Sequence, residues 1–257
     1  MTIDFLALQN LGNDLAKSAG QLAAQMQQEA VSNPETKSSA TDPVTAGDKA
    51  AEETIVNGIT DKRPDDGFKG EEGSTKSGTS GVVWHIDPID GTTNYLYGLP
   101  FSVSIAASYN NQIVAGSVFA PTANKLFSAA LGCGATCNGE PIYCRSPEAL
   151  ETALIAIGFS YQPAERQRQA QVLTGVLPMI RDIRRIGSAA LDLCAVACGQ
   201  VDGYYEEGLN LWDFAAGALI AKEAGAVVSD FKGEDPSEES LLAASPSIHG
   251  ELLHLLQ

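Results

Sequence analysis

The residues with the strongest chemical character lie in one short segment, Asp87-Pro88-Ile89-Asp90-Gly91-Thr92-Thr93-Asn94, directly after an apolar run. Asp87 and Asp90 are three residues apart, and the proline between them stiffens a turn that can point both carboxylates and the Ile89 carbonyl into one pocket. Hard oxygen ligands on a tight scaffold suit Mg²⁺. The glycine and threonines that follow are expected to open a helix, whose free N–H groups favour anions. Metal ligands beside such N–H groups are what a phosphate ester requires, although an Asp-Gly pair also forms ordinary turns.

Two further acidic segments could complete such a site. Glu71 lies in Gly70-Glu71-Glu72, 16 residues before Asp87, and we expect Glu72 to be its solvated neighbour. Asp213 begins a largely apolar helical segment that runs to Gly217. Taken alone, Asp213 is more typical of an acidic residue that the helix dipole stabilises. The three segments together favour a metal site.

The composition indicates a globular protein that handles phosphate through cations. Of the 257 residues, 44% are hydrophobic and 19% are charged, which excludes disorder as the main state. With 16 Lys and Arg against 32 Asp and Glu, the net charge is −16. Nonspecific nucleic-acid binding requires basic clusters, and anionic membranes should repel such a chain, so we expect neither as a partner. Bound divalent cations are the expected means of neutralising a phosphate.

The cysteines and the termini predict a cytoplasmic protein. Five cysteines, an odd number in a chain long enough to form a core, are typical of free thiols in a reducing compartment. Cys194 and Cys198 lie in an apolar helical run and are expected to be buried. The first residues lack the basic and apolar regions of a signal peptide, and no apolar run approaches the roughly 20 residues of a membrane span.

Hydrophobic spacing predicts the elements of the N-terminal half. Apolar residues three and four apart from Phe5 to Met26 mark one face of a long helix. A second helix is expected to begin at Asp48, as its N-cap, and to include Val56. His85 lies in the apolar run before Asp87 and is expected to pack or hydrogen-bond beside it. Loops are expected at 31–47 and 61–81, strands at 82–86, 102–109 and 113–119, and turns at 132–139.

From about Thr152 the pattern alternates short strands and helices. Strands are predicted at 154–157, 201–206 and 226–228, and helices at 164–177, 188–197, 212–224 and 248–256. Alternation of this kind indicates a layered α/β arrangement. A boundary near residue 147 would give an α+β metal-binding half, 1–147, and an α/β half, 148–257, that completes the active site.

Four segments in order resemble the inositol monophosphatase family of Mg²⁺-dependent, lithium-sensitive phosphatases. Two are its signature segments, Trp84 to Asn94 and Trp212 to Gly217, and the others are Gly70-Glu71-Glu72 and Asp42 to Asp48. The similarity extends from Lys37, in a loop that the family uses near its active site, to the last helix. It implies an α/β fold of the αβαβα sandwich type, two to three Mg²⁺ ions and a homodimer.

The resemblance also implies a role for each site residue. The residues that would hold the ions are Glu71, Asp87, Ile89 through its carbonyl, Asp90 and Asp213. Thr92, paired with Glu71, would orient the attacking water and help to deprotonate it, with Asp90 as a further catalytic residue. The attack would be in line and without a covalent enzyme intermediate, which agrees with the absence of phosphatase nucleophile motifs from the sequence.

The resemblance divides substrate binding between the phosphate and the alcohol. The N–H groups of Gly91 and Thr92 would hold phosphate oxygens, beside Asp90 and Asp213. The segment that relatives use to recognise the alcohol corresponds here to Arg184, Arg185, Gly187, Ser188, Ala189 and Glu206. Asp48 would act through a bridging water.

The metal site itself does not select the alcohol. Glu206 accepts hydroxyl hydrogen bonds, which suits a polyol, so we favour inositol 1-phosphate as substrate. Histidinol phosphate is the alternative, because a negative pocket also suits its amine. Relatives with the same motif act on fructose 1,6-bisphosphate, NADP or 3′-phosphoadenosine 5′-phosphate. A non-enzymatic alternative is a dimeric interaction protein whose metal site serves only the fold.

Overall fold

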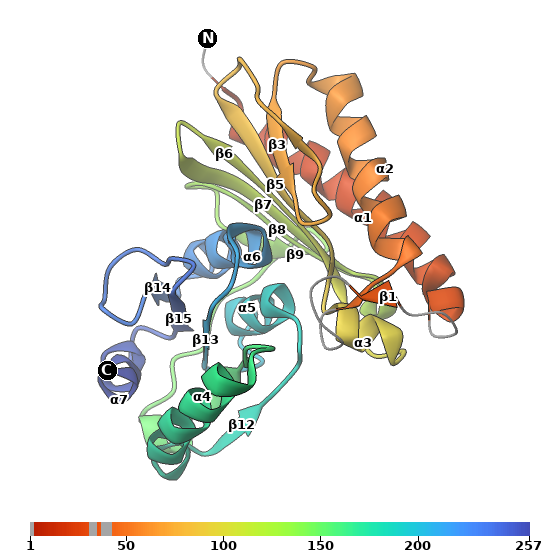
Figure 1. Cartoon of the computed structure of the whole chain (residues 1–257). Coiled ribbons are helices and arrows are strands. Elements are labelled where there is room, and N and C mark those ends of the chain that lie inside the picture. Colours follow the sequence, from red (N-terminus) through yellow and green to blue (C-terminus); the bar gives the residue numbers. More distant parts are fainter. Residues whose placement is uncertain (1–2, 31–34, 37–42) are drawn as a thin grey trace.

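The computed structural model describes residues 3–30, 35–36 and 43–257, which are arranged in five layers (Figure 1). Helices α1 (Phe5–Ala30) and α2 (Ala46–Lys62) cover one face of an eight-stranded sheet. Helices α5 (Ala189–Ala197) and α6 (Leu211–Glu223) separate this sheet from a five-stranded sheet. Helices α4 (Pro163–Val176) and α7 (His249–Leu256) lie outside the second sheet. The predicted α/β sandwich with αβαβα layers is therefore confirmed.

Neighbouring strands of the first sheet are consecutive in the chain except where β5 lies parallel to β3, and the second sheet contains further crossovers. The first sheet, in the order β10-β9-β8-β7-β6-β5-β3-β4, contains β3 (Gly67–Gly70), β4 (Thr75–Lys76), β5 (Val82–Asp90), β6 (Ser102–Tyr109), β7 (Gln112–Ala120), β8 (Lys125–Ala130), β9 (Ala135–Cys137) and β10 (Glu140–Pro141). The second, in the order β12-β11-β13-β15-β14, contains β11 (Leu154–Ile157), β12 (Asp182–Arg184), β13 (Gly203–Glu207), β14 (Val227–Ser229) and β15 (Ser240–Ala244). A short pair, β1 (Glu35–Thr36) with β2 (Pro43–Val44), and the short helix α3 (Thr92–Leu96) complete the α-helices and strands that the structure describes.

Each space between layers contains a hydrophobic cluster. Leu8, Leu15 and Ala19 of α1 are buried, as their spacing predicts, in the cluster that α1 forms with α2 and the first sheet. Leu252 and Leu256 of α7 belong to the cluster outside the second sheet. These apolar faces hold the layers at fixed positions, because interdigitated side chains leave little freedom to slide.

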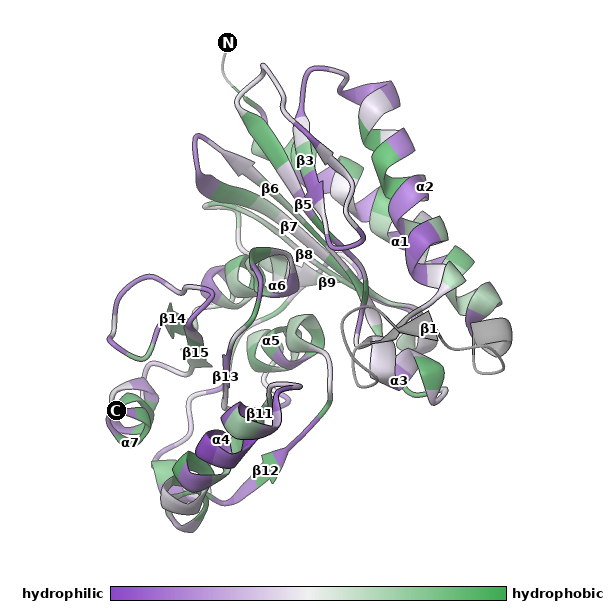
Figure 2. Cartoon of the chain, viewed as in Figure 1, coloured by the Kyte–Doolittle hydropathy of each residue, from purple (hydrophilic) through white to green (hydrophobic). Residues whose placement is uncertain are grey.

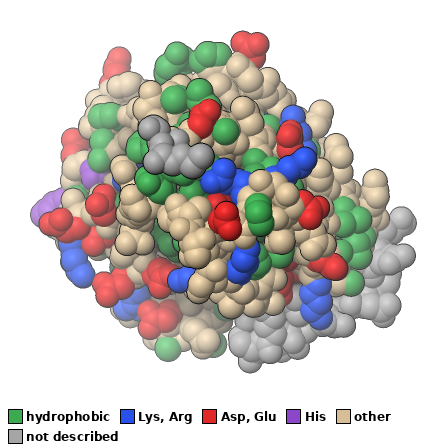
Figure 3. Space-filling model, turned by 90° about the horizontal axis from the view of Figure 1, so that it is seen from above, with side chains coloured by type: hydrophobic (Ala, Val, Ile, Leu, Met, Phe, Trp, Pro, Cys, Tyr) green, Lys and Arg blue, Asp and Glu red, His purple; other side chains and the backbone are tan. Residues whose placement is uncertain are grey.

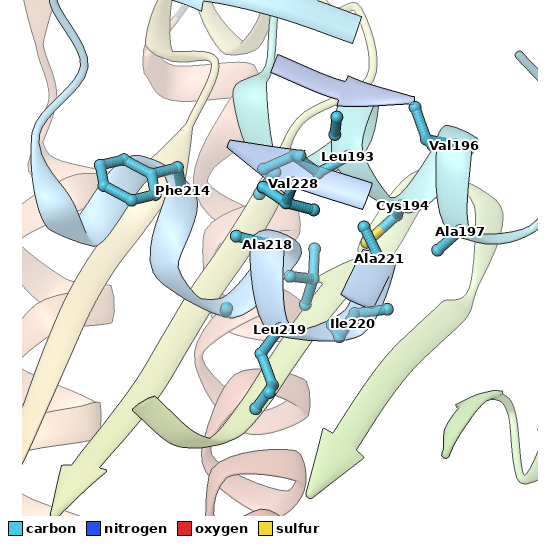
Figure 4. Packing of buried hydrophobic residues seen from close by; sticks show 14 of the residues in the cluster. Leu193, Cys194, Val196, Ala197, Phe214, Ala218, Leu219, Ile220, Ala221 and Val228 are labelled. Atoms are coloured by element: carbon cyan, nitrogen blue, oxygen red, sulfur yellow. The ribbon is translucent and has the colours of Figure 1, made fainter. Parts of the chain in front are cut away.

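The middle layer is the most apolar part of the chain. Helix α5 is hydrophobic on nearly all sides, which is typical of a helix buried between two sheets (Figure 2). Its residues Leu193 and Cys194 pack with Ala221 of α6 and Val228 of β14 (Figure 4). This packing places the N-terminal ends of α5 and α6 beside the carboxyl end of β5.

Most predicted elements are confirmed, with a few local corrections. Asp48 is the third residue of α2 rather than its N-cap, because Thr45 caps the helix and the Asp48 side chain accepts from the Thr45 N–H at 2.7 Å. The predicted loop 61–81 contains β3 and β4. Strands β8, β9, β10, β12 and β15 were not predicted, and β9 lies within the turns predicted at 132–139. Strands β8 and β15 are buried along nearly their whole length, so their sequences do not alternate, and the other three have only two or three residues. The loop predicted at 31–47 contains the short strands β1 and β2, and Lys37 and Asp42 lie outside the described residues.

The proposed division at residue 147 stays a prediction, although the two sheets fall on either side of it. Among the helices that the structure describes, none is both long and apolar enough to cross a bilayer.

On the face shown in Figure 3, acidic and basic side chains are interspersed, with hydrophobic side chains between them. The negative charge is thus not gathered into one continuous patch on that face.

Candidate metal and phosphate site

Three carboxylates from three separate elements meet at the carboxyl end of β5. Glu71 follows β3, Asp87 lies in β5, and Asp213 lies in the first turn of α6. One oxygen of each lies within 4.8 Å of the others. Strand β3 runs parallel to β5, which brings Glu71 beside Asp87 because parallel strands end at the same edge. The structure therefore brings these three residues close together, as predicted.

Burial and like charge make Asp87 and Asp213 costly to ionise. The Asp87 side chain is 2% exposed, and its pKa is raised by burial first and then by the charges of Glu71, Asp90 and Asp213. Burial also raises the pKa of Asp213 to about 8, and Asp90 and Glu71 add to this shift. A bound cation offsets both causes at once, because it replaces lost hydration and neutralises the repulsion.

The Asp87–Asp90 segment is a bulge in β5 that opens directly into α3. The register with β6 shifts between these two residues, where the proline lies. The Ile89 N–H donates to Asp87 Oδ1 at 3.0 Å, and Thr92 Oγ1 donates to the Ile89 carbonyl at 3.1 Å. Gly91 has a φ of 92°, a left-handed conformation that favours glycine. The bulge therefore re-aims the acidic side chains and starts the helix within a few residues.

Asp90 connects the end of β5 to the start of α5. Its carboxylate accepts hydrogen bonds from the Ser188 hydroxyl at 2.5 Å and from the N–H groups of Ala190 and Ala189 at 2.8 and 3.2 Å. Burial raises the pKa of Asp90 to about 6, and these three bonds oppose the shift. Asp90 is not part of the close carboxylate trio, and here it holds the start of α5 against β5.

Glu71 is positioned by a residue that the sequence did not single out. Glu52 of α2 is 2% exposed, and its carboxylate accepts from the N–H groups of Glu72 and Ser74 at 2.8 and 3.0 Å. A Cβ on Gly70 would lie 2.2 Å from Glu52 Oε2, so the turn requires glycine there. Glu72 is partly exposed, and its backbone N–H supports the turn. Glu52 gave no sequence signal, because it belongs to a helix far from the motif.

All eleven residues predicted for the site line one cavity of about 520 Å³: Glu71, Asp87, Ile89, Asp90, Gly91, Thr92, Gly187, Ser188, Ala189, Glu206 and Asp213. Asp48 is not among the lining residues. Arg185 lines the cavity, whereas Arg184 does not; Arg184 is half exposed and pairs with Asp182 at 2.8 Å. The prediction that Arg184 faces the alcohol is therefore wrong, because successive residues of a strand point to opposite faces.

Glu206 of β13 is a further carboxylate that lines the cavity. Tyr204 donates its hydroxyl hydrogen to Glu206 at 2.5 Å, and burial raises the pKa of Glu206 while this bond and Arg185 lower it. A Cβ on Gly158 would lie 1.6 Å from the Glu206 carboxylate, so glycine is required behind it. The arrangement fixes a partly buried hydrogen-bond acceptor in the cavity.

The sequence also missed the segment 159–162, which follows β11 and lines the cavity. Tyr161 lies there, near Asp90, Arg185 and Glu206, whose charges act on its pKa. The signal that could have found it is its position directly after a parallel strand, at the edge where α/β sheets bind ligands.

The comparisons with known proteins agree with this geometry. A family model described as the inositol monophosphatase family matches residues 7–257. An inositol-1-monophosphatase of Mycobacterium bovis is 44% identical over 232 residues, which are 86% of this chain and 80% of the relative. Nus factor SuhB of Pasteurella multocida is 39% identical over 96% of this chain and 95% of its own. The crystal structure of extragenic suppressor protein suhB from Bartonella henselae has a TM-score of 0.93 and 35% identity, and covers 98% of both chains.

Three findings agree. The family model covers nearly the whole chain, two relatives are 39% and 44% identical to it, and a solved structure shares its fold. The acidic trio is the group of residues expected in a metal-dependent phosphatase. The chain belongs to the inositol monophosphatase family.

Proposed function

We propose that this protein is a Mg²⁺-dependent phosphomonoesterase that hydrolyses inositol 1-phosphate to inositol and phosphate. The observation that carries the proposal is the trio Glu71, Asp87 and Asp213 in the same cavity as the partly buried acceptor Glu206. The carboxylate trio suits a phosphate held by metal ions, and Glu206 suits the hydroxyl groups of the alcohol. Relatives named inositol-1-monophosphatase support this substrate.

The residues present fit Mg²⁺, because they provide three carboxylate oxygens close together, those of Asp87 buried and those of Glu71 and Asp213 partly exposed. Glu71, Asp87 and Asp213 would hold the ions, joined by the Ile89 carbonyl and by Asp90. Bound Mg²⁺ would neutralise the phosphate and stabilise the leaving alkoxide. We propose two to three ions, as the family resemblance implies.

The chain's own groups would position the attacking water. Thr92 gives its hydroxyl hydrogen to the Ile89 carbonyl, so its oxygen is left to accept a hydrogen from water. Glu71 lies in the same cavity and can take the water's proton. The N–H groups of Gly91 and Thr92 would bind phosphate oxygens and fix the phosphorus for in-line attack.

Replacing Glu206 by Gln should change the preference among alcohols. The amide keeps one oxygen but presents N–H donors where hydroxyl hydrogens would point, so kcat/KM for inositol 1-phosphate should fall about tenfold or more. Hydrolysis of 4-nitrophenyl phosphate, which has no hydroxyls to recognise, should change little. An equal loss on both substrates would count against a substrate-reading role. Glu151→Gln, on the exposed surface, is the control.

The proposed reaction is tested by phosphate release from a substrate panel, with Mg²⁺ and with a chelator. The panel comprises inositol 1-phosphate, histidinol phosphate, fructose 1,6-bisphosphate, NADP and 3′-phosphoadenosine 5′-phosphate. We expect chelator-sensitive release that is fastest from inositol 1-phosphate. Faster release from histidinol phosphate would keep the chemistry and replace the substrate, and no release from any would contradict the enzymatic proposal.

A second candidate role is supported by relatives named Nus factor SuhB, which match this chain over nearly its full length. In this role the protein would act by binding a partner, and its metal site would serve the fold. Complementation separates the two: cells that lack this gene would be supplied with the Asp87→Asn variant. Full rescue by a variant that releases no phosphate would favour the interaction role.

We further propose a cytoplasmic homodimer, as the family resemblance implies. Size-exclusion chromatography with light scattering should then give twice the mass of the chain. A monomer at micromolar concentration would contradict this proposal.

A further inference from the structure

Tyr161 is an aromatic residue that stands half exposed on the wall of the catalytic cavity. Its relative exposure is 48%, and of the large hydrophobic residues that remain exposed in the described part of the chain, it is the one that lines this cavity. Two other aromatic residues of the wall are less exposed, since Phe159 packs against the cluster outside the second sheet and Trp212 is half-buried. An aromatic ring left open to a cavity provides a large contact surface for a ligand.

The backbone that carries Tyr161 is fixed on both sides of this residue. Before it, the Ser160 N–H donates to Oε1 of Gln169 at 3.0 Å, and Gln169 is a buried residue of α4. After it, the Gln162 N–H donates to the Ser160 hydroxyl oxygen at 3.1 Å, and α4 begins at the next residue. A side chain on such a backbone loses little freedom when a ligand binds, so its contact can be specific.

Parallel pairing of β11 with β13 brings this segment beside Glu206. Ile157, the last residue of β11, pairs with Tyr205 of β13, and parallel strands end at the same edge of a sheet. The Gly158 N–H donates to the Tyr205 carbonyl at 3.3 Å, and a Cβ on Gly158 would overlap the Glu206 carboxylate. Tyr161 follows three residues later, and the charge of Glu206 raises the pKa of its hydroxyl.

Tyr161 also reaches the segment that is expected to bind the phosphate. Its hydroxyl interacts with the side chain of Thr93, in the first turn of α3, and the charge of Asp90 acts on the same hydroxyl. A side chain within reach of Thr93, Asp90 and Glu206 lies along the path from the phosphate to the hydroxyl groups of the alcohol. The alcohol of a bound substrate would therefore lie against Tyr161.

An aromatic ring and a carboxylate recognise different parts of a cyclic polyol. The hydroxyl groups of inositol lie mostly around the edge of its ring, whereas the two faces of the ring present C–H groups. The face of an aromatic ring is electron-rich and attracts C–H groups. A carboxylate such as that of Glu206 accepts hydrogen bonds from hydroxyl groups at the edge. A linear polyol such as glycerol has no ring face to offer, so an aromatic contact favours the cyclic alcohol.

We propose that Tyr161 is a specificity-determining residue, whose ring packs against the C–H face of the alcohol while Glu206 accepts hydrogen bonds from the hydroxyl groups at its edge. This inference rests on the proposed phosphatase function, because its ligand is the alcohol part of that substrate. It goes further by assigning a preference for cyclic over linear polyol phosphates to one side chain. The contact of the Tyr161 hydroxyl with Thr93 helps to hold the ring in this orientation.

Kinetics on a cyclic and a linear substrate test the contact. Tyr161→Leu should raise KM for inositol 1-phosphate about fivefold, the usual size of a lost aromatic contact, with little change in kcat. The loss on glycerol 2-phosphate should be much smaller, and Tyr161→Phe, which keeps the ring, should restore most of the affinity for inositol 1-phosphate. Tyr143→Leu removes an exposed tyrosine that does not line the cavity and should change neither constant.

Calorimetric binding separates this inference from the phosphatase reaction. With Ca²⁺, which takes the same oxygen ligands as Mg²⁺ in a looser geometry, inositol 1-phosphate should bind Tyr161→Leu about fivefold more weakly than the wild type. This result without phosphate release would contradict the phosphatase function alone. Equal losses on the two substrates, or no loss on either, would overturn the role of Tyr161 alone, and a wild type that neither binds nor hydrolyses inositol 1-phosphate would contradict both. Circular dichroism melting of each variant confirms that it is folded.

Discussion

Replacing Asp87 by Asn should lower Mg²⁺-dependent phosphate release about a thousandfold, because a metal-held transition state loses several kcal/mol of stabilisation with a central ligand. Asp87 is the most buried of the close trio and lies within reach of both of its partners. Rates of inositol 1-phosphate hydrolysis over a wide Mg²⁺ range provide the measurement. Near-normal turnover in saturating Mg²⁺ would contradict the metal assignment.

The same substitution should stabilise the metal-free protein. The pKa of Asp87 is raised in the folded state, so ionising this side chain at neutral pH destabilises the fold. An asparagine amide stays neutral and avoids this loss of stability. The folded state binds the proton of Asp87 more tightly than the unfolded state does. The stability of the metal-free fold therefore falls as the pH rises above the pKa that Asp87 has in the unfolded chain. Melting in chelator at pH 7.5 should show a higher midpoint for Asp87→Asn than for the wild type. Asp61→Asn, exposed on α2, is the control and should shift neither rate nor midpoint.

Replacing Glu52 by Gln should impair both stability and the use of Mg²⁺, although Glu52 does not line the catalytic cavity. Its carboxylate accepts two backbone hydrogen bonds that hold the turn carrying Glu71. In the amide, an NH₂ group would face one of these N–H donors, so we expect a loss of about 2–3 kcal/mol in unfolding free energy. The freed turn should displace Glu71 and raise the Mg²⁺ concentration required for half-maximal rate.

The neighbouring Glu53→Gln provides a matched control, because Glu53 is on the same helix and exposed. A structural role alone would lower the melting midpoint but leave the Mg²⁺ requirement unchanged at temperatures where the variant is folded. A shift in the Mg²⁺ requirement separates a positioning role from such a general loss of stability. An unchanged requirement would mean that the turn holds Glu71 without Glu52.

The local sequence determined those helices and strands whose own residues show a hydrophobic period. The apolar face of α1, the buried run of β5 and the helical segments α5 and α6 are confirmed within a few residues. The residues of the site were implied by the resemblance to a known family, and all eleven of them line one cavity. The predictions of helices and strands succeed because periodicity and turn chemistry act over neighbouring residues.

The tertiary structure alone decided the contacts between segments far apart in the chain. The bonds from the start of α5 to Asp90, and from the 71–74 turn to Glu52, join elements with no shared local pattern. Such contacts arise only when layers pack, because a hydrogen-bond partner is selected by its position in space and not by its distance along the sequence.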